Sequence, residues 1–262
     1  PRVVGKTRVN DVESFFVRAR LVDVPSSPEL TQIDTIHGAI KITGEGLLPE
    51  QFLSHTAEDI FTNQDPGRRF EPFGKEPRKE SECYIRVDQA FCHKGALVRL
   101  DFPLEGGETS KPNASPDLTL KWEYYNATSK RWRTLATCKY GEGKIEAAEE
   151  ARFSDGTACF TKSGIVSFVV PDDLSAAEVN GTEGLFMRCR IDAGDYGVPG
   201  TYELDGDRWV FKDARPLRPP MLREMAVRFE EKEHFFQHVF AENDGVFSDY
   251  SEQATVEFKP FT

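Results

Sequence analysis

Apolar and polar residues alternate along several short stretches of the chain, and the clearest stretch is DLTLKWEYY (117–125). Every second residue in it is apolar or aromatic, namely Leu118, Leu120, Trp122 and Tyr124, whereas Thr, Lys and Glu lie between them. Successive side chains of a β-strand point to opposite faces, so this period of two predicts a strand with one buried face.

Other stretches carry related patterns. ECYIRV (82–87) and ALVRLDF (96–102) alternate in the same way. SGIVSFVVPDD (163–173) begins as a nearly continuous apolar run, which predicts a strand buried on both faces and ended by Pro171. Turn-forming clusters separate these stretches. The spacing therefore predicts a mainly β chain built on an antiparallel, immunoglobulin-like β-sandwich.

Helical patterns are scarce. KIEAAEEARF (144–153) has the composition of a short helix, and PDDLSAAEV (171–179) has aspartates suited to an N-cap. LLPEQFLSHTAEDI (47–60) is a weaker candidate. We expect these few short helices to connect strands rather than to form a layer of their own.

One strand pattern occurs twice in the sequence. FFVRARL (15–21) and LFMRCRI (185–191) agree in polarity at every position. Each places a Phe and two Arg on one face and apolar residues on the other. Three further pairs of segments are similar in the same order: 28–33 with 220–225, 61–65 with 240–245, and 68–74 with 256–262. The sequence therefore predicts two copies of a strand-plus-connector segment.

This repeat predicts three parts of the chain. Residues 1–79 form copy A, the end of a preceding β module plus its connector; residues 80–195 form the sandwich; and residues 196–262 form copy B. Copy B is longer, and the extra residues fall in the Gly- and Pro-rich segment 197–217. Two interpretations stay open: the chain is part of a serial array of modules, or it is a self-contained domain with two similar lobes.

Charge and cysteine content narrow the function classes. The chain has 33 basic and 44 acidic side chains, a net charge of −11, which disfavours nucleic acid and anionic membranes as partners. No apolar run approaches the ~20 residues of a membrane-spanning helix, so we expect no membrane insertion. The 5 cysteines include no CxxC pair. Free thiols in a reducing compartment are the expectation.

Five segments in a fixed order carry a family resemblance. FFVRAR is followed by Phe70–Gly74, by the hairpin Trp122–Trp132, by Thr161–Pro171 and by Gly181–Arg190. This order resembles the baseplate assembly proteins of contractile phage tails and of phage-tail-like contractile injection systems. The resemblance covers residues 13–262 for the most part. It departs at Leu185-Phe186, where the family often has Trp, and in the 197–217 segment.

The resemblance implies a structural role without catalytic residues. The implied partners are other baseplate and tail proteins. The implied location is the bacterial cytoplasm during assembly, and then the virion or tail-like particle.

The two arginine pairs are candidate interface residues. Arg18 and Arg20 belong to the first strand copy, and Arg188 and Arg190 to the second. In one interpretation they bind carboxylates of a neighbouring subunit. In the other, which we favour, they pair with acidic residues on the adjacent strand of the same sheet.

Three aromatic residues are further candidates for an interface. Tyr125 and Trp132 flank the turn NATSK, and Trp209 lies in the 197–217 segment. Exposed aromatics suit protein–protein contacts. They also suit stacking on sugar rings.

The sequence offers little for catalysis or cofactors. His234 and His238 have a spacing of four but no HExxH motif, and no phosphate-binding or dinucleotide-binding fingerprint is present. We therefore expect no cofactor, no metal and no catalytic residue. The leading hypothesis is a structural baseplate subunit. The alternatives are a secreted glycan-binding or adhesin module, and a hydrolase that uses paired carboxylates.

Overall fold

The computed structural model describes most of the chain, in two compact units. The described residues are 6–14, 16, 18, 39–40, 42–106, 111–212, 215–231, 234–235, 238–243 and 245–251. The larger unit spans 41–232, and the smaller one combines 1–40 with 233–262.

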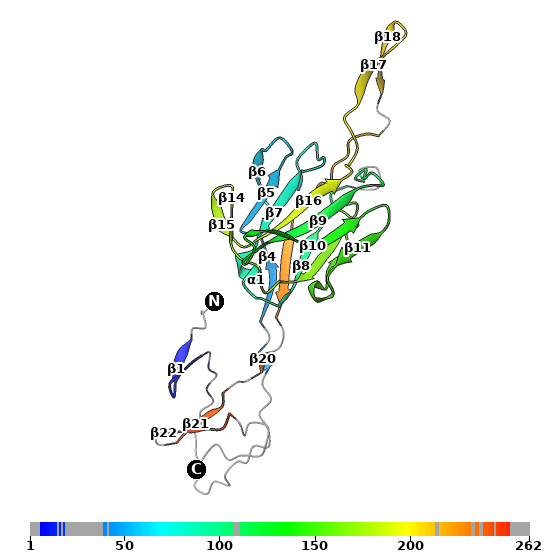
Figure 1. The fold of residues 1–262 in the computed structure, drawn as a ribbon. Helices are drawn as coiled ribbons and strands as arrows, with labels where there is room; N and C mark the ends of the chain where they lie inside the picture. The colour runs from blue at the N-terminus through cyan, green and yellow to red at the C-terminus, as the bar shows by residue number, and fades with distance from the viewer. Residues whose placement is uncertain are drawn as a thin grey trace. The chain divides into compact units, whose positions relative to one another are not determined.

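The larger unit contains a seven-stranded sheet in which every pair of neighbours is antiparallel. The strand order is β11-β10-β9-β16-β7-β5-β6 (Figure 1). In chain order the strands are β5 (Gln51–His55), β6 (Phe61–Gln64), β7 (Glu82–Arg86), β9 (Thr119–Asn126), β10 (Arg131–Lys139), β11 (Lys144–Ala147) and β16 (Phe186–Ala193).

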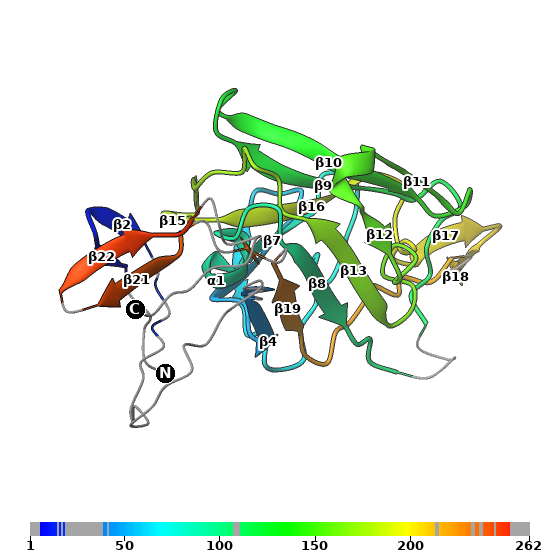
Figure 2. The same cartoon turned by 90° about the horizontal axis from the view of Figure 1, so that it is seen from below.

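A five-stranded antiparallel sheet, of order β12-β13-β8-β19-β4, forms the second layer (Figure 2). Its strands are β4 (Thr43–Leu47), β8 (Leu97–Phe102), β12 (Ser154–Asp155), β13 (Gly164–Val169) and β19 (Ala226–Glu230). Two hairpins belong to neither sheet: β14 (Ala177–Val179) with β15 (Thr182–Gly184), and β17 (Thr201–Asp205) with β18 (Arg208–Lys212). Two helical turns complete the unit, α1 (Asp88–Phe91) and the 3-10 turn Glu149–Ala151. The chain is mainly β and has the layers of an antiparallel sandwich.

The smaller unit contains three two-stranded sheets among its described residues. They are β1 (Thr7–Val9) with β2 (Val12–Ser14), β3 (Ala39–Ile40) with β20 (His234–Phe235), and β21 (Phe240–Asn243) with β22 (Val246–Asp249). Segments from both ends of the chain therefore belong to one unit.

The sandwich core is built from the alternating residues of both sheets. The four apolar residues of 117–125 all belong to it, as the pattern predicted. All four apolar residues of ALVRLDF are also fully buried: Ala96, Val98, Leu100 and Phe102. In β16 the prediction is confirmed too, because Met187, Cys189 and Ile191 enter this core whereas Arg188 lies on the other face. Local alternation thus determined which face each strand buries.

Two sequence predictions about the strands need correction. The β13 run is buried on one face only: Val166, Phe168 and Val170 are in the core, but Ile165 is 38% exposed. The sandwich also extends beyond the predicted 80–195, because β5 pairs with β7 and β19 pairs with β8. Strands distant in sequence complete both sheets, so the sandwich runs from β4 to β19.

The three helix predictions were wrong. Residues 144–153 form the edge strand β11 followed by a 3-10 turn, and residues 171–179 form a turn that leads into β14. Residues 47–60 contain β5, whose Phe52 and Leu53 are fully buried. Pairing with a neighbouring strand overrides a weak helical preference, because it satisfies the backbone and buries side chains at the same time.

The predicted repeat falls largely outside the described residues. This holds for most of FFVRARL and for the whole of 28–33 and 256–262. One pair of segments is described in both copies, and its members begin as strands β6 and β21. However, β6 is the second strand of its hairpin with β5, whereas β21 is the first strand of its hairpin with β22. The duplication stays a prediction.

A left-handed turn follows β12 and was not predicted. Three successive non-glycine residues have positive φ angles: Ala158 (49°), Cys159 (56°) and Phe160 (54°). The carboxylate of Asp155 accepts hydrogen bonds from the backbone N–H groups of Thr157 and Cys159, both at 2.8 Å. Left-handed backbone costs roughly 1–2 kcal/mol per L-residue in a helix. The hydrogen bonds and the burial of Phe160 offset that cost.

We expect Ala158→Gly to stabilise the larger unit by about 0.5–1 kcal/mol, because glycine has no Cβ to oppose a positive φ. Urea denaturation measures this change. The matched control is Ala147→Gly in exposed strand β11, where the same substitution is expected to destabilise by a similar amount. A loss of stability at position 158 equal to that at position 147 would contradict the assignment of a strained turn.

Candidate functional site

The β17–β18 hairpin is the strongest candidate site on the described surface. Its sequence is TYELDGDRWVFK (201–212), and Asp205 lies opposite Arg208, which leaves a two-residue turn. Gly206, the first residue of the turn, has a φ of +64°. Two-residue hairpin turns of type II′ need this conformation at that position, and glycine adopts it without steric cost. The turn residues therefore suit a tight two-stranded ribbon at this point of the chain.

One face of this ribbon is entirely apolar. Tyr202 lies opposite Phe211 with ring centroids 5.2 Å apart, and Leu204 lies opposite Trp209. The exposed fractions of the four side chains, in chain order, are 67%, 60%, 69% and 52%. We call these four residues the apolar hairpin face. Isolated two-stranded ribbons are marginally stable in water, so this face is suited to being covered.

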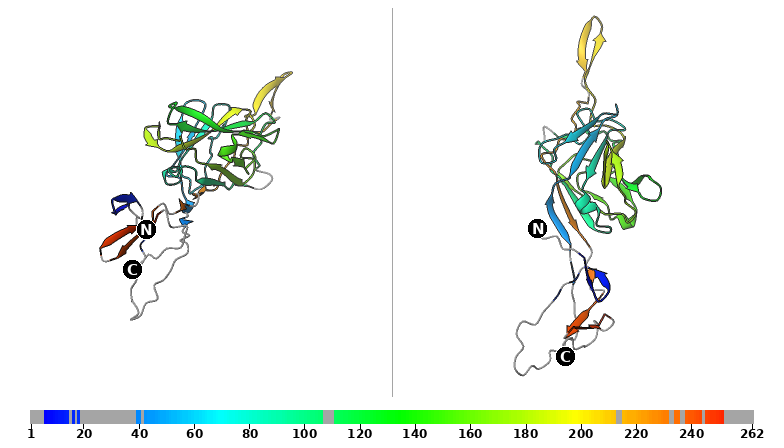
Figure 3. Two further views of the ribbon diagram at one scale, coloured as in Figure 1. Left: turned by 60° about the horizontal axis from the view of Figure 1, so that its bottom comes forward. Right: turned by 90° about the vertical axis from the view of Figure 1, so that its left-hand side faces the viewer.

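The opposite face of the ribbon carries the charged side chains, with Val210 among them. Glu203 and Lys212 form an ion pair across the strands with 2.8 Å between Oε2 and Nζ. All ten strand residues are exposed, and in Figures 1 and 3 the hairpin projects away from the two sheets. No strand among the described residues covers either face.

The base of the hairpin is anchored in the sandwich. Tyr196 is fully buried, and its hydroxyl donates a 2.8 Å hydrogen bond to the carbonyl of Cys159. Its own carbonyl accepts from the N–H of Arg218 at 2.9 Å, on the returning chain. Gly197 has a φ of +96°, and a Cβ there would collide with the Pro216 carbonyl. Core contacts thus hold both legs of the hairpin together where they leave the sheet.

Arg188 and Arg190 pair with acidic residues of their own sheet, as the favoured interpretation predicted. Arg188 Nη2 lies 2.7 Å from Glu123 Oε2 on β9, and Nη1 lies 3.1 Å from Glu82 Oε1 on β7. Arg190 lies 3.7 Å from Glu123 on β9, and it also pairs at 2.9 Å with Glu80, which precedes β7. Burial lowers the pKa of Arg188, but the neighbouring carboxylates outweigh this and the net pKa is raised above its usual value. Arg188 therefore stays charged within the sheet.

Trp132 and Tyr125 shield this ion network. The Trp132 ring lies over the Arg188 guanidinium at 4.5 Å, and it contacts Tyr84 and Tyr125 edge-on at 5.5 and 5.8 Å. Both residues pack against a small second hydrophobic cluster on the outer face of the seven-stranded sheet. They are half-buried rather than free, so the sequence overestimated their availability for partners.

Tyr84 shares this environment. Burial raises the pKa of Tyr84, and its hydrogen bond to Glu82 raises it further, so the phenol stays protonated at neutral pH. Cation–π and edge-on aromatic contacts of this kind stabilise the ion network in addition to the burial of its side chains. The cluster is therefore arranged for stability.

The remaining predicted residues lie in different places. Trp209 belongs to the apolar hairpin face, as the expectation of an interface requires. Arg18 is exposed, and Arg20 lies outside the described residues. Three members of the hairpin face were not predicted: Tyr202, Leu204 and Phe211. A signal existed, because the pair Gly206-Asp207 between two runs of alternating apolar residues is a hairpin pattern.

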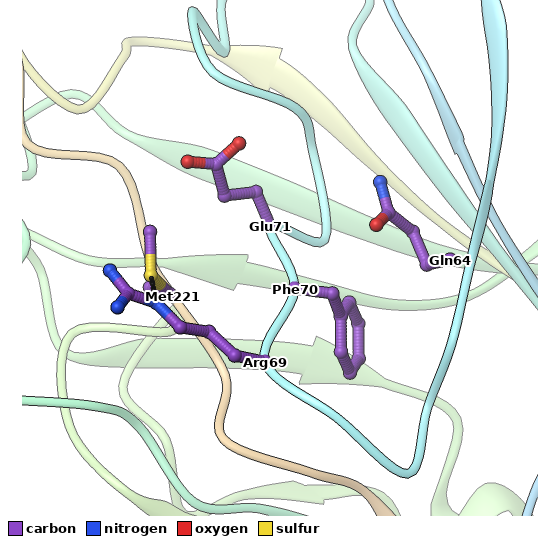
Figure 4. Close-up of a pocket in the computed structure, with 5 residues that line it drawn as sticks. All are labelled: Gln64, Arg69, Phe70, Glu71 and Met221. Carbon is purple, nitrogen blue, oxygen red and sulfur yellow. Dashed lines mark hydrogen bonds between the residues drawn. The ribbon is translucent and has the colours of Figure 1, made fainter.

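Two shallow pockets lie elsewhere on the sandwich. The first has a volume of about 240 Å³ and is lined by Gln64, Arg69, Phe70, Glu71 and Met221 (Figure 4). It combines an arginine, a carboxylate and an amide with two apolar side chains, and Arg69 is engaged by Glu105 at 2.5 Å. Its lining supplies a single carboxylate, that of Glu71.

The second pocket, of about 390 Å³, is lined by Asn126, Thr128, Ser129, Arg133 and Asp173. Arg133 pairs with Asp173 at 3.3 Å, and Asn126 Oδ1 accepts from the N–H of Ser129 at 2.7 Å. These contacts order the NATSK turn. The lining of the second pocket also holds a single carboxylate, that of Asp173.

The cysteines and histidines form no evident reactive centre in the described part of the chain. All five cysteines are unpaired, and four of them are buried. Burial raises the pKa of Cys159 to about 12, so its thiol is not activated at neutral pH. No group of three or more His, Cys, Asp or Glu residues suited to a metal ion occurs among the described residues. Within the same residues, no helix is long and apolar enough to cross a membrane.

Comparison with known proteins gives no match to a protein-family model and no match to a curated protein. The class that the fold defines is an antiparallel β-sandwich with a projecting hairpin. The hairpin and the surfaces of the sandwich are the features of this chain that bear on its function.

Proposed function

We propose that this chain is a structural, non-enzymatic subunit that acts through protein–protein interfaces in the baseplate of a contractile phage tail-like particle. The observation that carries the proposal is the apolar hairpin face. Four large side chains on one exposed ribbon face present the aromatic and aliphatic surface that interface centres use.

The energetics favour a partner on this face. Covering a large apolar side chain fully contributes about 1.5–3 kcal/mol, so the four partly exposed side chains together contribute about 4–7 kcal/mol. Association itself costs a comparable or larger amount. The hairpin face would thus be one anchor within a larger contact, which is how assemblies with several interfaces per subunit are held together.

The segments that carry the family resemblance support the same function. Phe73 and Trp122 are buried in the sandwich core, and Phe168 lies between the sheets with them. Arg188 in the last segment joins three strands through Glu82 and Glu123. Because these residues build the scaffold, a shared order of such segments indicates a shared sandwich. A sandwich with a two-sided core resists deformation, as a load-transmitting subunit requires.

The proposal is tested by purifying the tagged full chain at native abundance from the cells that make it, followed by negative-stain imaging. We expect tail-like particles that carry the tag at the baseplate end. Replacing both Tyr202 and Trp209 by Ser should reduce incorporation into particles at least tenfold, because it removes the largest exposed part of the apolar hairpin face. The control is Ile165→Ser, which removes an exposed apolar side chain from the sandwich surface.

Wild-type chain that elutes free of particles, from cells in which such particles are abundant, would exclude the proposal. Tyr202 and Trp209 also favour the alternative of a glycan-binding module, because exposed aromatic rings stack on sugars. That alternative predicts retention of the full chain on polysaccharide, lost in the same double variant. Retention on polysaccharide together with absence from particles would replace the proposed function by the alternative.

A further inference from the structure

The two long edges of the β17–β18 ribbon are both open. Among the described residues, β17 and β18 hydrogen-bond only to each other. Each strand therefore presents one row of backbone N–H and C=O groups on its outer edge. Such an edge is a template for a further strand.

The two edges carry opposite charge. Strand β17 contributes Glu203 and Asp205 and no basic residue, whereas β18 contributes Arg208 and Lys212 and no acidic residue. All four charged side chains are exposed. The ribbon thus has an acidic edge and a basic edge, in a chain whose overall charge is acidic.

Within the ribbon, the acidic strand β17 and the basic strand β18 already pair with each other. In the antiparallel register, Asp205 lies opposite Arg208, and Lys212 reaches Glu203 at 2.8 Å. The outer edge of β18 offers the same residue types at the same spacing to any second acidic strand. The strand that matches it is the β17 of another copy.

We infer that the partner at the hairpin edges is a second copy of this chain, with the acidic β17 of one copy adding to the basic β18 of the next. Pairing β17 with β17 would place acid against acid, and pairing β18 with β18 would place base against base. Like charges opposite each other destabilise strand pairs, so charge selects the head-to-tail arrangement. This inference deepens the proposed function, because it assigns a partner to the edges of the same hairpin.

The head-to-tail arrangement has a structural consequence. A contact between different surfaces of identical subunits closes into a ring or continues as a filament, unlike a two-fold dimer. If the register within the ribbon is repeated between copies, Tyr202, Leu204, Trp209 and Phe211 of every copy lie on one face of a shared sheet. The apolar hairpin faces then join into one continuous surface that another component can cover.

The test uses a charge-swapped full chain, Glu203→Lys/Asp205→Lys/Arg208→Glu/Lys212→Glu. This variant keeps opposite charges across its own ribbon, so the hairpin is preserved while the sign of each edge is exchanged. Sedimentation velocity at low salt is expected to show the 29.6 kDa wild-type chain self-associating, and the swapped chain self-associating equally. Mixed with wild type, the swapped chain should associate at least tenfold more weakly, because every mixed junction pairs like charges.

A control swaps charges on an exposed edge strand of the sandwich, Lys144→Glu/Glu146→Lys in β11, and should associate with wild type normally. Wild type that is monomeric at all concentrations and salt levels would overturn the inference, as would free mixing of swapped and wild-type chains. The proposed function has a separate readout. If wild type is monomeric but the Tyr202/Trp209 double variant still loses incorporation into particles, the inference fails and the proposed function stands.

Discussion

Replacing Arg188 by Ala is expected to destabilise the larger unit by about 3–5 kcal/mol, measured as a lowered free energy of unfolding in urea. The Arg188 side chain is only 15% exposed, and it lies between Glu82 and Glu123, which are more buried still. Without the guanidinium, two carboxylates face each other across β16, and Glu123 keeps only the longer contact with Arg190 at 3.7 Å. Trp132 also loses the cation beneath its ring.

A second variant separates the lost charge from the lost packing. Arg188→Met combined with Glu82→Gln and Glu123→Gln removes all three charges but keeps most of the volume, and should recover most of the stability. The surface control is Arg228→Ala, since Arg228 is half exposed and lies 3.6 Å from Asp101. Exposed pairs contribute little, about 0–1 kcal/mol. An Arg188→Ala cost no greater than that of Arg228→Ala would show that the network does not stabilise the sheet.

Replacing Phe160 by Ala is expected to cost about 3–5 kcal/mol of unfolding free energy. Phe160 is 1% exposed and contacts three aromatic rings, those of Phe102 at 4.9 Å, Phe73 at 5.5 Å and Trp122 at 6.1 Å. The ring also secures the left-handed turn, so its removal leaves a cavity and releases the strained backbone at once. Urea denaturation followed by tryptophan fluorescence measures the effect.

Phe211→Ala is the matched control for this prediction. It removes the same side chain from the exposed hairpin, where we expect a change in stability of under about 1 kcal/mol. We expect Phe211→Ala to weaken assembly rather than to lower stability. Equal destabilisation by the two substitutions would mean that Phe160 is not part of the core that holds the sheets together.

The candidate site was only partly predictable from the sequence. Trp209 was identified from its residue type and its place in the Gly- and Pro-rich segment, and it does lie on an exposed face. Tyr125 and Trp132 were chosen because they flank the turn NATSK, but Trp132 lies over Arg188 and Tyr125 packs edge-on against Trp132. A turn-flanking aromatic looks the same in sequence whether or not a distant strand covers it. Availability to a partner is therefore a property of the tertiary structure.

The sequence alone determined the β class of this protein and the buried face of most of its strands, because alternation is a local property set by residues two positions apart. The sequence also contained the charged residues of the hairpin and the glycine of its turn. Only the tertiary structure decided that 144–147 and 51–55 are strands, that β13 has one open face, and that Arg188 lies between two carboxylates. Each of those outcomes depends on which distant segments become neighbours, and the free energy of that pairing outweighs local preference.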